Sequence, residues 1–132
     1  MKKTVFAGLF VLIASLVSLT ARADSTVGYF GFEPDIITNY IGASSKKMGY
    51  VRITIDLMLN NASDIATVEH HTPLLRDALV EILSKEPEDK IKSLSGREEI
   101  RIKSAAKLKS LLKEETGQEI IREVLFTKYL YH

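Results

Sequence analysis

Apolar side chains recur at helical spacing between residues 72 and 84. Their i, i+3, i+4, i+7 spacing is that of a helix that buries one face. The members of this stripe are Leu75, Ala78, Leu79, Ile82 and Leu83. Arg76, Asp77 and Glu81 fall on or near the opposite side. Because a helix of this length is marginal alone, the stripe needs a partner to pack against.

The clearest strand runs from Tyr50 to Leu59, where aliphatic residues occupy every second position. A period of two places all of these aliphatic side chains on one face of a sheet. They are Val51, Ile53, Ile55, Leu57 and Leu59. Burial of one face is typical of an antiparallel sheet whose other face is exposed to solvent. We expect the aliphatic face to pack against the apolar stripe of the 72–84 helix.

Extended segments also precede this strand. Residues 28–41 are predicted as one interrupted strand or two short ones, because Pro34 ends a ladder or lies at an edge. Residues 42–49 have the composition of a turn, so the strands on either side of it should form a hairpin.

Shorter helical segments flank the helix over 72–84. A helix capped by Ser63 or Asp64 leads into it and either kinks or restarts at Pro73, with Thr72 as the predicted N-cap. After it, we expect one helical turn over 87–91 and then a loop.

A longer helix is predicted from Ser95, whose spacing to Glu98 matches a capping box, up to Gly117. Its expected apolar positions are Ile102, Ala105, Ala106, Leu108, Leu111 and Leu112. Its basic residues are Arg97, Arg101, Lys103, Lys107, Lys109 and Lys113. A solvated face with cations toward the C-terminal half accounts for them, because the helix dipole favours that placement. The alternative is a surface for anionic membranes, which would need a local excess of positive charge.

The last predicted strand covers residues 120–131. One face would carry Ile120, Val124, Phe126 and Leu130, and the other Ile121, Glu123, Leu125, Thr127, Tyr129 and Tyr131. Both faces are partly apolar, which predicts a central strand or one covered at its end. The elements together predict an α+β fold, with a small antiparallel sheet of about three strands packed by two or three helices.

Residues 1–23 have the pattern of an export signal. Lys2 and Lys3 precede an apolar run, and Ala21-Arg22-Ala23 places small residues at the −3 and −1 positions of a cleavage site before Asp24. The alternative is a short uncleaved membrane anchor, although the run is shorter than the roughly 20 residues that a spanning helix needs. Either way, residues 24–132 are predicted to form a single domain in the periplasm.

The charge and the residue types exclude several functional classes. Lys2, Lys3 and Arg22 precede Asp24, which leaves 15 basic residues against 17 acidic ones, a net charge of −2. A slightly acidic domain is a poor candidate for binding nucleic acid. The chain has no cysteine, so thiolate zinc sites and cysteine nucleophiles are excluded.

No residue pattern indicates catalysis or a cofactor. Glu69-His70-His71 is the one cluster with metal character, but adjacent helical side chains point about 100° apart and cannot share a metal as an i, i+4 pair does. The paired acids at 88–89, 98–99 and 114–115 lack the apolar surroundings that raise the pKa of a general acid. We therefore predict a protein that is not an enzyme and has no cofactor, metal or small-molecule substrate.

The outward residues His71, Arg76, Asp77 and Glu81 are the candidates for contact with another protein. Arg76 and Asp77 lie mid-helix beside the core stripe. An exposed ion pair there would contribute a few tenths of a kcal/mol. The alternative is a charged contact with another subunit, and both interpretations remain open.

The segment His71-Thr72-Pro73-Leu74-Leu75-Arg76-Asp77-Ala78-Leu79 closely resembles the H-x-P-L-[IL]-R-[DN]-x-[LV] segment of the FliL family of flagellar basal-body-associated proteins. The strand over 50–59, the Ser-Gly-Arg-Glu-Glu helix start at 95–99 and the terminal Val124–Leu130 segment resemble that family's corresponding parts. So does the early segment over 29–40, and the likeness extends over about residues 28–131.

The resemblance implies a non-enzymatic periplasmic domain with a stomatin-like fold, at or near the inner membrane. It also implies association with flagellar stator or basal-body proteins, self-assembly into a homo-oligomer, and an effect on swimming, swarming and chemotaxis. Members of the family usually have a membrane-spanning helix and a spacer before the domain. Cleavage between Ala23 and Asp24 would instead give a soluble periplasmic protein. The alternative function is a periplasmic binding or adaptor module for a peptide or lipid, with a pocket lined by Phe126, Leu130 and the Leu75–Leu83 stripe.

Overall fold

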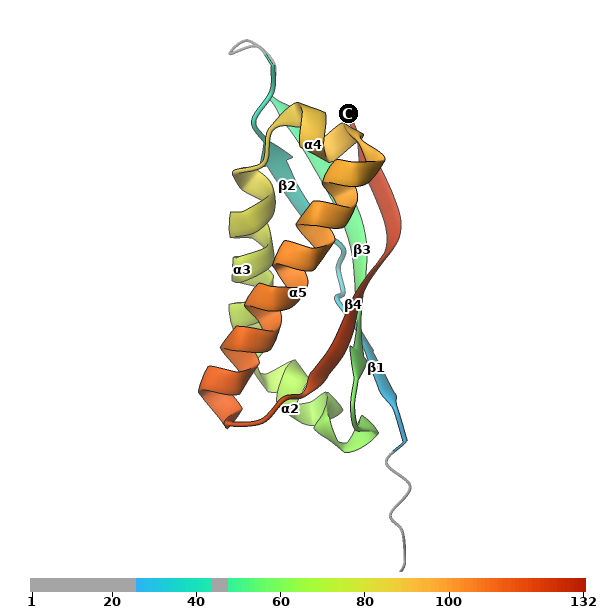
Figure 1. The fold of residues 1–132 in the computed structure, drawn as a ribbon, viewed down its shortest axis with the longest axis vertical. Helices are drawn as coiled ribbons and strands as arrows, with labels where there is room; N and C mark the ends of the chain where they lie inside the picture. The colour runs from blue at the N-terminus through green and yellow to red at the C-terminus, as the bar shows by residue number, and fades with distance from the viewer. Residues whose placement is uncertain (1–25, 44–47) are drawn as a thin grey trace, which may run out of the picture.

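The computed structural model describes residues 26–43 and 48–132, so the predicted export segment and half of the predicted turn over 42–49 lie outside the described residues. Figure 1 shows one antiparallel sheet with helices packed against it. The elements, in order, are β1 (Gly28–Gly31), β2 (Ile36–Tyr40), β3 (Gly49–Leu59), the short 3-10 turn η1 (Ala62–Asp64), α2 (Ile65–His70), α3 (Thr72–Ser84), α4 (Glu88–Lys92), α5 (Leu94–Thr116) and β4 (Ile121–Tyr131). The predicted α+β class is therefore confirmed, with four strands among the described residues in place of about three.

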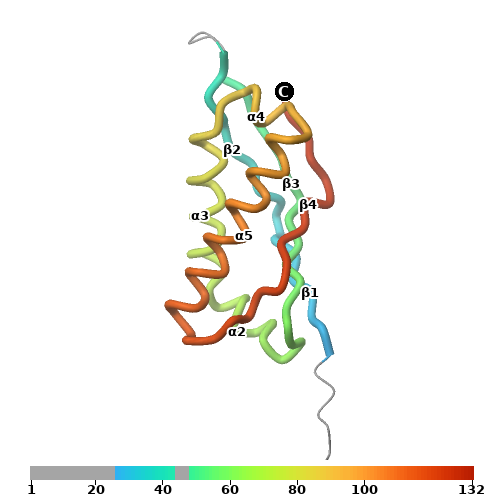
Figure 2. The backbone as a smooth tube through the Cα atoms, in the orientation of Figure 1, coloured from blue at the N-terminus to red at the C-terminus, as the bar shows by residue number. Residues whose placement is uncertain are grey.

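β3 is the centre of the sheet. On one side it pairs with β2 near its start, where Ile36 lies opposite Ile53, and with β1 near its end, where Gly28 lies opposite Leu59. β4 runs antiparallel along the other side for almost the whole length of β3. Of the two alternatives predicted for residues 28–41, the structure has two short strands, and the predicted antiparallel pairing across the 42–49 turn is confirmed. β1 and β2 lie on the same flank of β3, because β4 occupies the other flank at both ends. Figure 2 shows β2 beside the upper end of β3 and β1 beside its lower end.

α3 and α5 cover one face of the sheet, and the other face is open among the described residues (Figure 1). The aliphatic residues of β3 that face these helices are fully buried: Val51, Ile53, Ile55, Leu57 and Leu59. Leu75, Leu79 and Leu83 of α3 are equally buried in the same core cluster, while Ile82 is half-buried. The alternation in β3 and the stripe in α3 thus form the core as predicted.

The start of α3 differs from the prediction. α2 ends at His70 and α3 restarts at Thr72, so Thr72 is the first helical residue and His71 occupies the N-cap position without a side-chain cap. The Thr72 hydroxyl donates instead to the carbonyl oxygen of Val68, at 3.1 Å. Because α2 ends immediately before α3, the last carbonyl groups of α2 lie within reach of that hydroxyl.

α5 begins earlier than predicted, and its buried face agrees with the prediction only in part, at Leu108 and Leu112. Ser93 is its N-cap, and the Ser93 hydroxyl accepts a hydrogen bond from the Gly96 N–H at 3.0 Å. Since α4 ends at Lys92, almost none of the predicted loop remains before α5. The buried residues of α5 form an i, i+4 row: Gly96, Ile100, Ser104, Leu108 and Leu112. Ile102, predicted to be a core residue, is 56% exposed.

β4 is an edge strand among the described residues, which contradicts the first of the two predicted alternatives, a central strand. Its side chains also do not follow the predicted division into even and odd faces, because the pairing with β3 shifts register twice, between Thr54 and Ile55 and between Met58 and Leu59. Each shift inserts one extra residue, a β-bulge, and changes which residues face the helices. The residues of β4 opposite the buried aliphatic residues of β3 are Ile121, Val124, Phe126, Tyr129 and Tyr131.

Candidate interaction surface

Three of the four predicted contact residues lie on the outward side of α3 or immediately before it. Asp77 and Glu81 are exposed and one helical turn apart, and Glu81 forms an ion pair of 2.7 Å with Lys85. His71 is half-buried, with its Nδ1 2.8 Å from the carbonyl oxygen of Thr67. The role of these residues in binding a partner stays a prediction.

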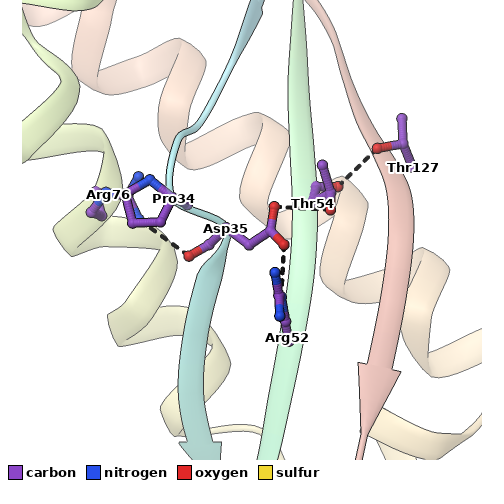
Figure 3. A network of polar contacts seen from close by, with 6 residues as sticks. All are labelled: Pro34, Asp35, Arg52, Thr54, Arg76 and Thr127. Carbon is purple, nitrogen blue, oxygen red and sulfur yellow. Dashed lines mark hydrogen bonds and ion pairs between the residues drawn. The ribbon is translucent and has the colours of Figure 1, made fainter.

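Arg76, the fourth, is engaged within the chain (Figure 3). Its guanidinium donates to the carbonyl oxygen of Pro34 at 2.7 Å and to that of Asp35 at 3.5 Å. The same group lies 5.7 Å from the centre of the Phe32 ring, a cation–π distance. Arg76 therefore holds the connection between β1 and β2 against α3.

The connection that Arg76 holds also carries a carboxylate, Asp35, on the open side of the sheet. Asp35 accepts hydrogen bonds from Arg52 Nε at 2.7 Å and from the Thr54 hydroxyl at 3.0 Å, and the Thr127 hydroxyl of β4 donates to the carbonyl oxygen of Thr54 (Figure 3). The hydrogen bond from Arg52, followed by that from Thr54, lowers the pKa of Asp35 below its usual value. One polar network thus links the β1–β2 connection, β3 and β4.

Exposed apolar side chains lie next to this network, on the open face of the sheet. Ile37 of β2, Arg52 of β3 and Leu130 of β4 form one cross-strand row. Ile37 is 57% exposed, Leu130 46%, and the neighbouring Tyr50 51%. Together with Arg52 they border a shallow groove of about 230 Å³. We call Ile37, Tyr50 and Leu130 the outer apolar patch. Several large apolar side chains gathered on an open sheet are typical of a surface that binds another protein.

A second cation–aromatic contact lies near the C-terminal end of β4, and no pattern in the sequence predicted it. The guanidinium of Arg97 on α5 stacks 4.3 Å from the centre of the Tyr129 ring. The Tyr129 hydroxyl donates to the carbonyl oxygen of Ile91 at 2.7 Å, and burial raises the pKa of Tyr129 to about 12. Arg97 and Tyr129 are far apart in the chain. Their contact could be predicted only from the register in which β4 pairs with β3.

Phe126, Leu130 and the Leu75–Leu83 stripe do not form the pocket predicted for a peptide or lipid within the described residues. Phe126 lies opposite Ile55 on the helix side of the sheet, whereas Leu130 lies opposite Arg52 on the open side. Leu75, Leu79 and Leu83 have no exposed surface. These residues cannot line a common cavity, because the bulge at Thr127 separates Phe126 from Leu130 and the leucine stripe is filled by core contacts.

A family model described as flagellar basal body-associated protein FliL matches residues 29–131. The chain belongs to the FliL family. A similar relative is the "Flagellar protein FliL" of Aquifex aeolicus (strain VF5), which is 28% identical over 101 residues. The aligned part covers 76% of this chain and 59% of the relative, so the chain spans less than two thirds of the relative's length. This confirms the resemblance seen in the sequence and associates the chain with the bacterial flagellum.

The FliL match covers all the strands except the first residue of β1, and all the helices that the structure describes. The family-like segment from His71 to Leu79 forms the start of α3, with Leu75 and Leu79 in the core and Arg76 bound to Pro34. The segment therefore has a structural role in this FliL domain, because it joins the core to the β1–β2 connection.

The structure also bears on metal binding and membrane insertion within the FliL domain. Over residues 26–43 and 48–132, no three His, Cys, Asp or Glu side chains are grouped so that they could hold a metal ion. His70 and His71 stack edge to face, with ring centres 5.1 Å apart. None of the helices in these ranges is both long enough and apolar enough to span a membrane.

Proposed function

We propose that this chain is a non-enzymatic component of the flagellar basal body that supports the stator units through protein–protein contacts, and thereby supports swimming, swarming and chemotaxis. Membership of a family of flagellar basal-body-associated proteins is the observation that carries the proposal. The chain would act in the periplasm, at or near the inner membrane, as a homo-oligomer.

The distribution of apolar side chains supports a role in contact rather than in chemistry. The helix side of the sheet is a filled core, whereas the outer apolar patch lies open beside the Asp35–Arg52 ion pair. A sheet face with apolar residues and a polar rim is suited to burial against a partner. Asp77 and Glu81 offer a separate, charged face on α3 for contact with a neighbouring copy.

Deletion of the gene tests the functional proposal. We expect slower swimming, reduced swarming and lower motor torque under load, all restored by the wild-type chain. Normal motility and torque in the deletion strain would contradict the proposal.

Complementation with two matched variants tests the outer apolar patch. Ile37→Ser should restore motility poorly, because it removes an apolar side chain from the patch. Ile102→Ser is the control, since Ile102 on α5 is exposed to almost the same extent, 56% against 57%. Equal restoration by both variants would exclude the patch from the function.

The predicted export segment needs a separate measurement. We expect the mature chain to begin at Asp24, in the soluble periplasmic fraction. An intact N-terminus in the inner-membrane fraction would show instead that residues 1–23 anchor the protein.

A further inference from the structure

The outer edge of β4 exposes backbone groups near its end. Among the described residues β4 pairs with β3 alone, and Figure 1 shows no strand on its other side. The N–H of His132 donates to the carbonyl oxygen of Tyr50 at 3.0 Å. Because successive residues of an antiparallel strand face alternately toward and away from the partner, the backbone groups of Tyr131 and Tyr129 point to the free edge.

The lower part of this edge is protected. Arg101 Nη1 donates to the carbonyl oxygen of Val124 at 3.2 Å, and the bulge at Thr127 interrupts the strand above that point. Bulges and capping side chains are the usual ways in which an edge strand avoids unwanted pairing. Of β4, the stretch from Lys128 to Tyr131 lies beyond both features.

Arg97 lies beside this unprotected stretch with its hydrogen-bonding capacity unused. Its guanidinium is held on the Tyr129 ring, and its Nε is buried with no hydrogen-bond partner in the part of the chain that the structure describes. No carboxylate of the described residues is within ion-pair distance of Arg97. Two neighbouring cations of α4 and α5 are already paired, Lys92 with Glu88 and Arg101 with Glu98.

We propose that an extended segment of a partner protein adds as a strand to Lys128–Tyr131, and that Arg97 binds a carboxylate of that segment. Strand addition supplies main-chain hydrogen bonds, and side-chain contacts supply the specificity. The residue paired with Tyr129 would lie about 5.5 Å away with its side chain on the same face as the Tyr129 ring. An acidic side chain there reaches Arg97, whose planar group can bind both oxygens of a carboxylate.

The charge of β4 favours a partner protein over a second copy of this chain. The stretch Lys128-Tyr129-Leu130-Tyr131 contains no acidic residue, so two copies paired over it would place a tyrosine, and no carboxylate side chain, opposite Tyr129 beside Arg97. The inference rests on one part of the proposed function, that the chain acts through contacts with other proteins. It adds the chemistry of one such contact, a strand pairing with a carboxylate bound to Arg97.

A peptide-binding measurement with the purified full chain tests the site. The probes are labelled seven-residue peptides of alternating Thr and Val with one Glu at each position in turn, and their Gln analogues. We expect the best Glu peptide to bind about tenfold more tightly than its Gln analogue, as for one charge-assisted hydrogen bond. Arg97→Met should abolish this preference, and Arg97→Lys should restore part of it. Lys109→Met, which removes another exposed cation of α5, should leave it unchanged.

Amide hydrogen exchange locates the bound peptide. The amides of Tyr129 and Tyr131 should exchange more slowly with the Glu peptide present. Equal affinity for Glu and Gln peptides, no binding, or protection elsewhere would overturn the proposal. So would a dimer of the chain that protects these amides without peptide, because the occupant would then be a second copy. Normal motility in the deletion strain would overturn the proposed function and leave the peptide preference intact.

Discussion

The guanidinium of Arg76 donates a hydrogen bond of 2.7 Å to the carbonyl oxygen of Pro34, which is 42 residues away in sequence. The bond joins the helix at the centre of the family-like segment to the connection between β1 and β2. In the sequence Arg76 is an outward-facing residue of α3, available to a neighbouring subunit. In the structure it is an internal contact that fixes where β2 begins.

Replacing Arg76 should weaken the fold without unfolding it. Arg76→Met keeps the aliphatic stem but removes the hydrogen bond to Pro34, so we expect the free energy of unfolding to fall by about 1–2 kcal/mol. Urea denaturation followed by circular dichroism measures this change. Asp77→Ala, on the exposed side of α3, is the control and should change stability by less than about 0.5 kcal/mol. Equal stability of both variants would show that the contact with Pro34 contributes nothing.

The Asp35 network should make stability depend on pH. The pKa of Asp35 is lowered in the folded chain, chiefly by the hydrogen bond from Arg52. Its stabilising contribution is therefore present above the unfolded pKa, about 4, and is lost as the pH falls through the lower folded value. Asp35→Asn should lower the urea midpoint at pH 7, and the difference from wild type should shrink below about pH 4. A pH-independent difference between wild type and Asp35→Asn would contradict this account.

The register of α5 can be tested with two isoleucines. Ile100 is 1% exposed and belongs to the core cluster, whereas Ile102 is 56% exposed. Ile100→Ala should cost about 2–5 kcal/mol, because it leaves a cavity between α5 and the sheet. Ile102→Ala should cost less than about 0.5 kcal/mol. If Ile102→Ala instead cost more than Ile100→Ala, Ile102 would belong to the core, as the sequence pattern predicted.

Gly96 should resist a substitution that normally favours a helix. Alanine at an ordinary helical position is about 1 kcal/mol better than glycine. At Gly96 a Cβ would overlap the carbonyl oxygen of Lys90, a backbone atom that cannot move without shifting α4. Gly96→Ala should therefore destabilise the domain by about 1–3 kcal/mol, measured by urea denaturation. Ser110→Ala, at an exposed position of α5, should have no such cost, and a stabilised Gly96→Ala variant would exclude the close packing of α4 on α5.

The elements that the sequence predicted correctly are those in which hydrophobicity alone marks the buried face. The alternation in β3 and the leucine stripe in α3 consist of large aliphatic residues, and both are fully buried. In α5 the buried row contains Gly96 and Ser104, which no apolar pattern reveals, while the exposed Ile102 suggests a false face. Hydrophobicity therefore predicted the wrong buried positions in the part of α5 where small residues allow close packing.

The candidate contacts were harder to predict because they depend on register. The bulge at Thr127 in β4 brings Phe126 and Tyr129 to one face although they are an odd number of residues apart, and strict alternation separates them. No motif surrounds Arg76 or Asp35 in the sequence, and the groups that each of them binds belong to other elements of the fold. The family segment was recognisable in the sequence, but its arginine was assigned to an outside partner rather than to Pro34.

The central position of β3 has a mechanical consequence. β1 and β4 both run antiparallel to β3, and Gly28 and Tyr131 lie toward opposite ends of it. A pulling force applied between these two residues acts along the strands and across the ladder hydrogen bonds, which run perpendicular to them. The bonds between β3 and β4 must then yield together under shear, instead of opening one after another from an end.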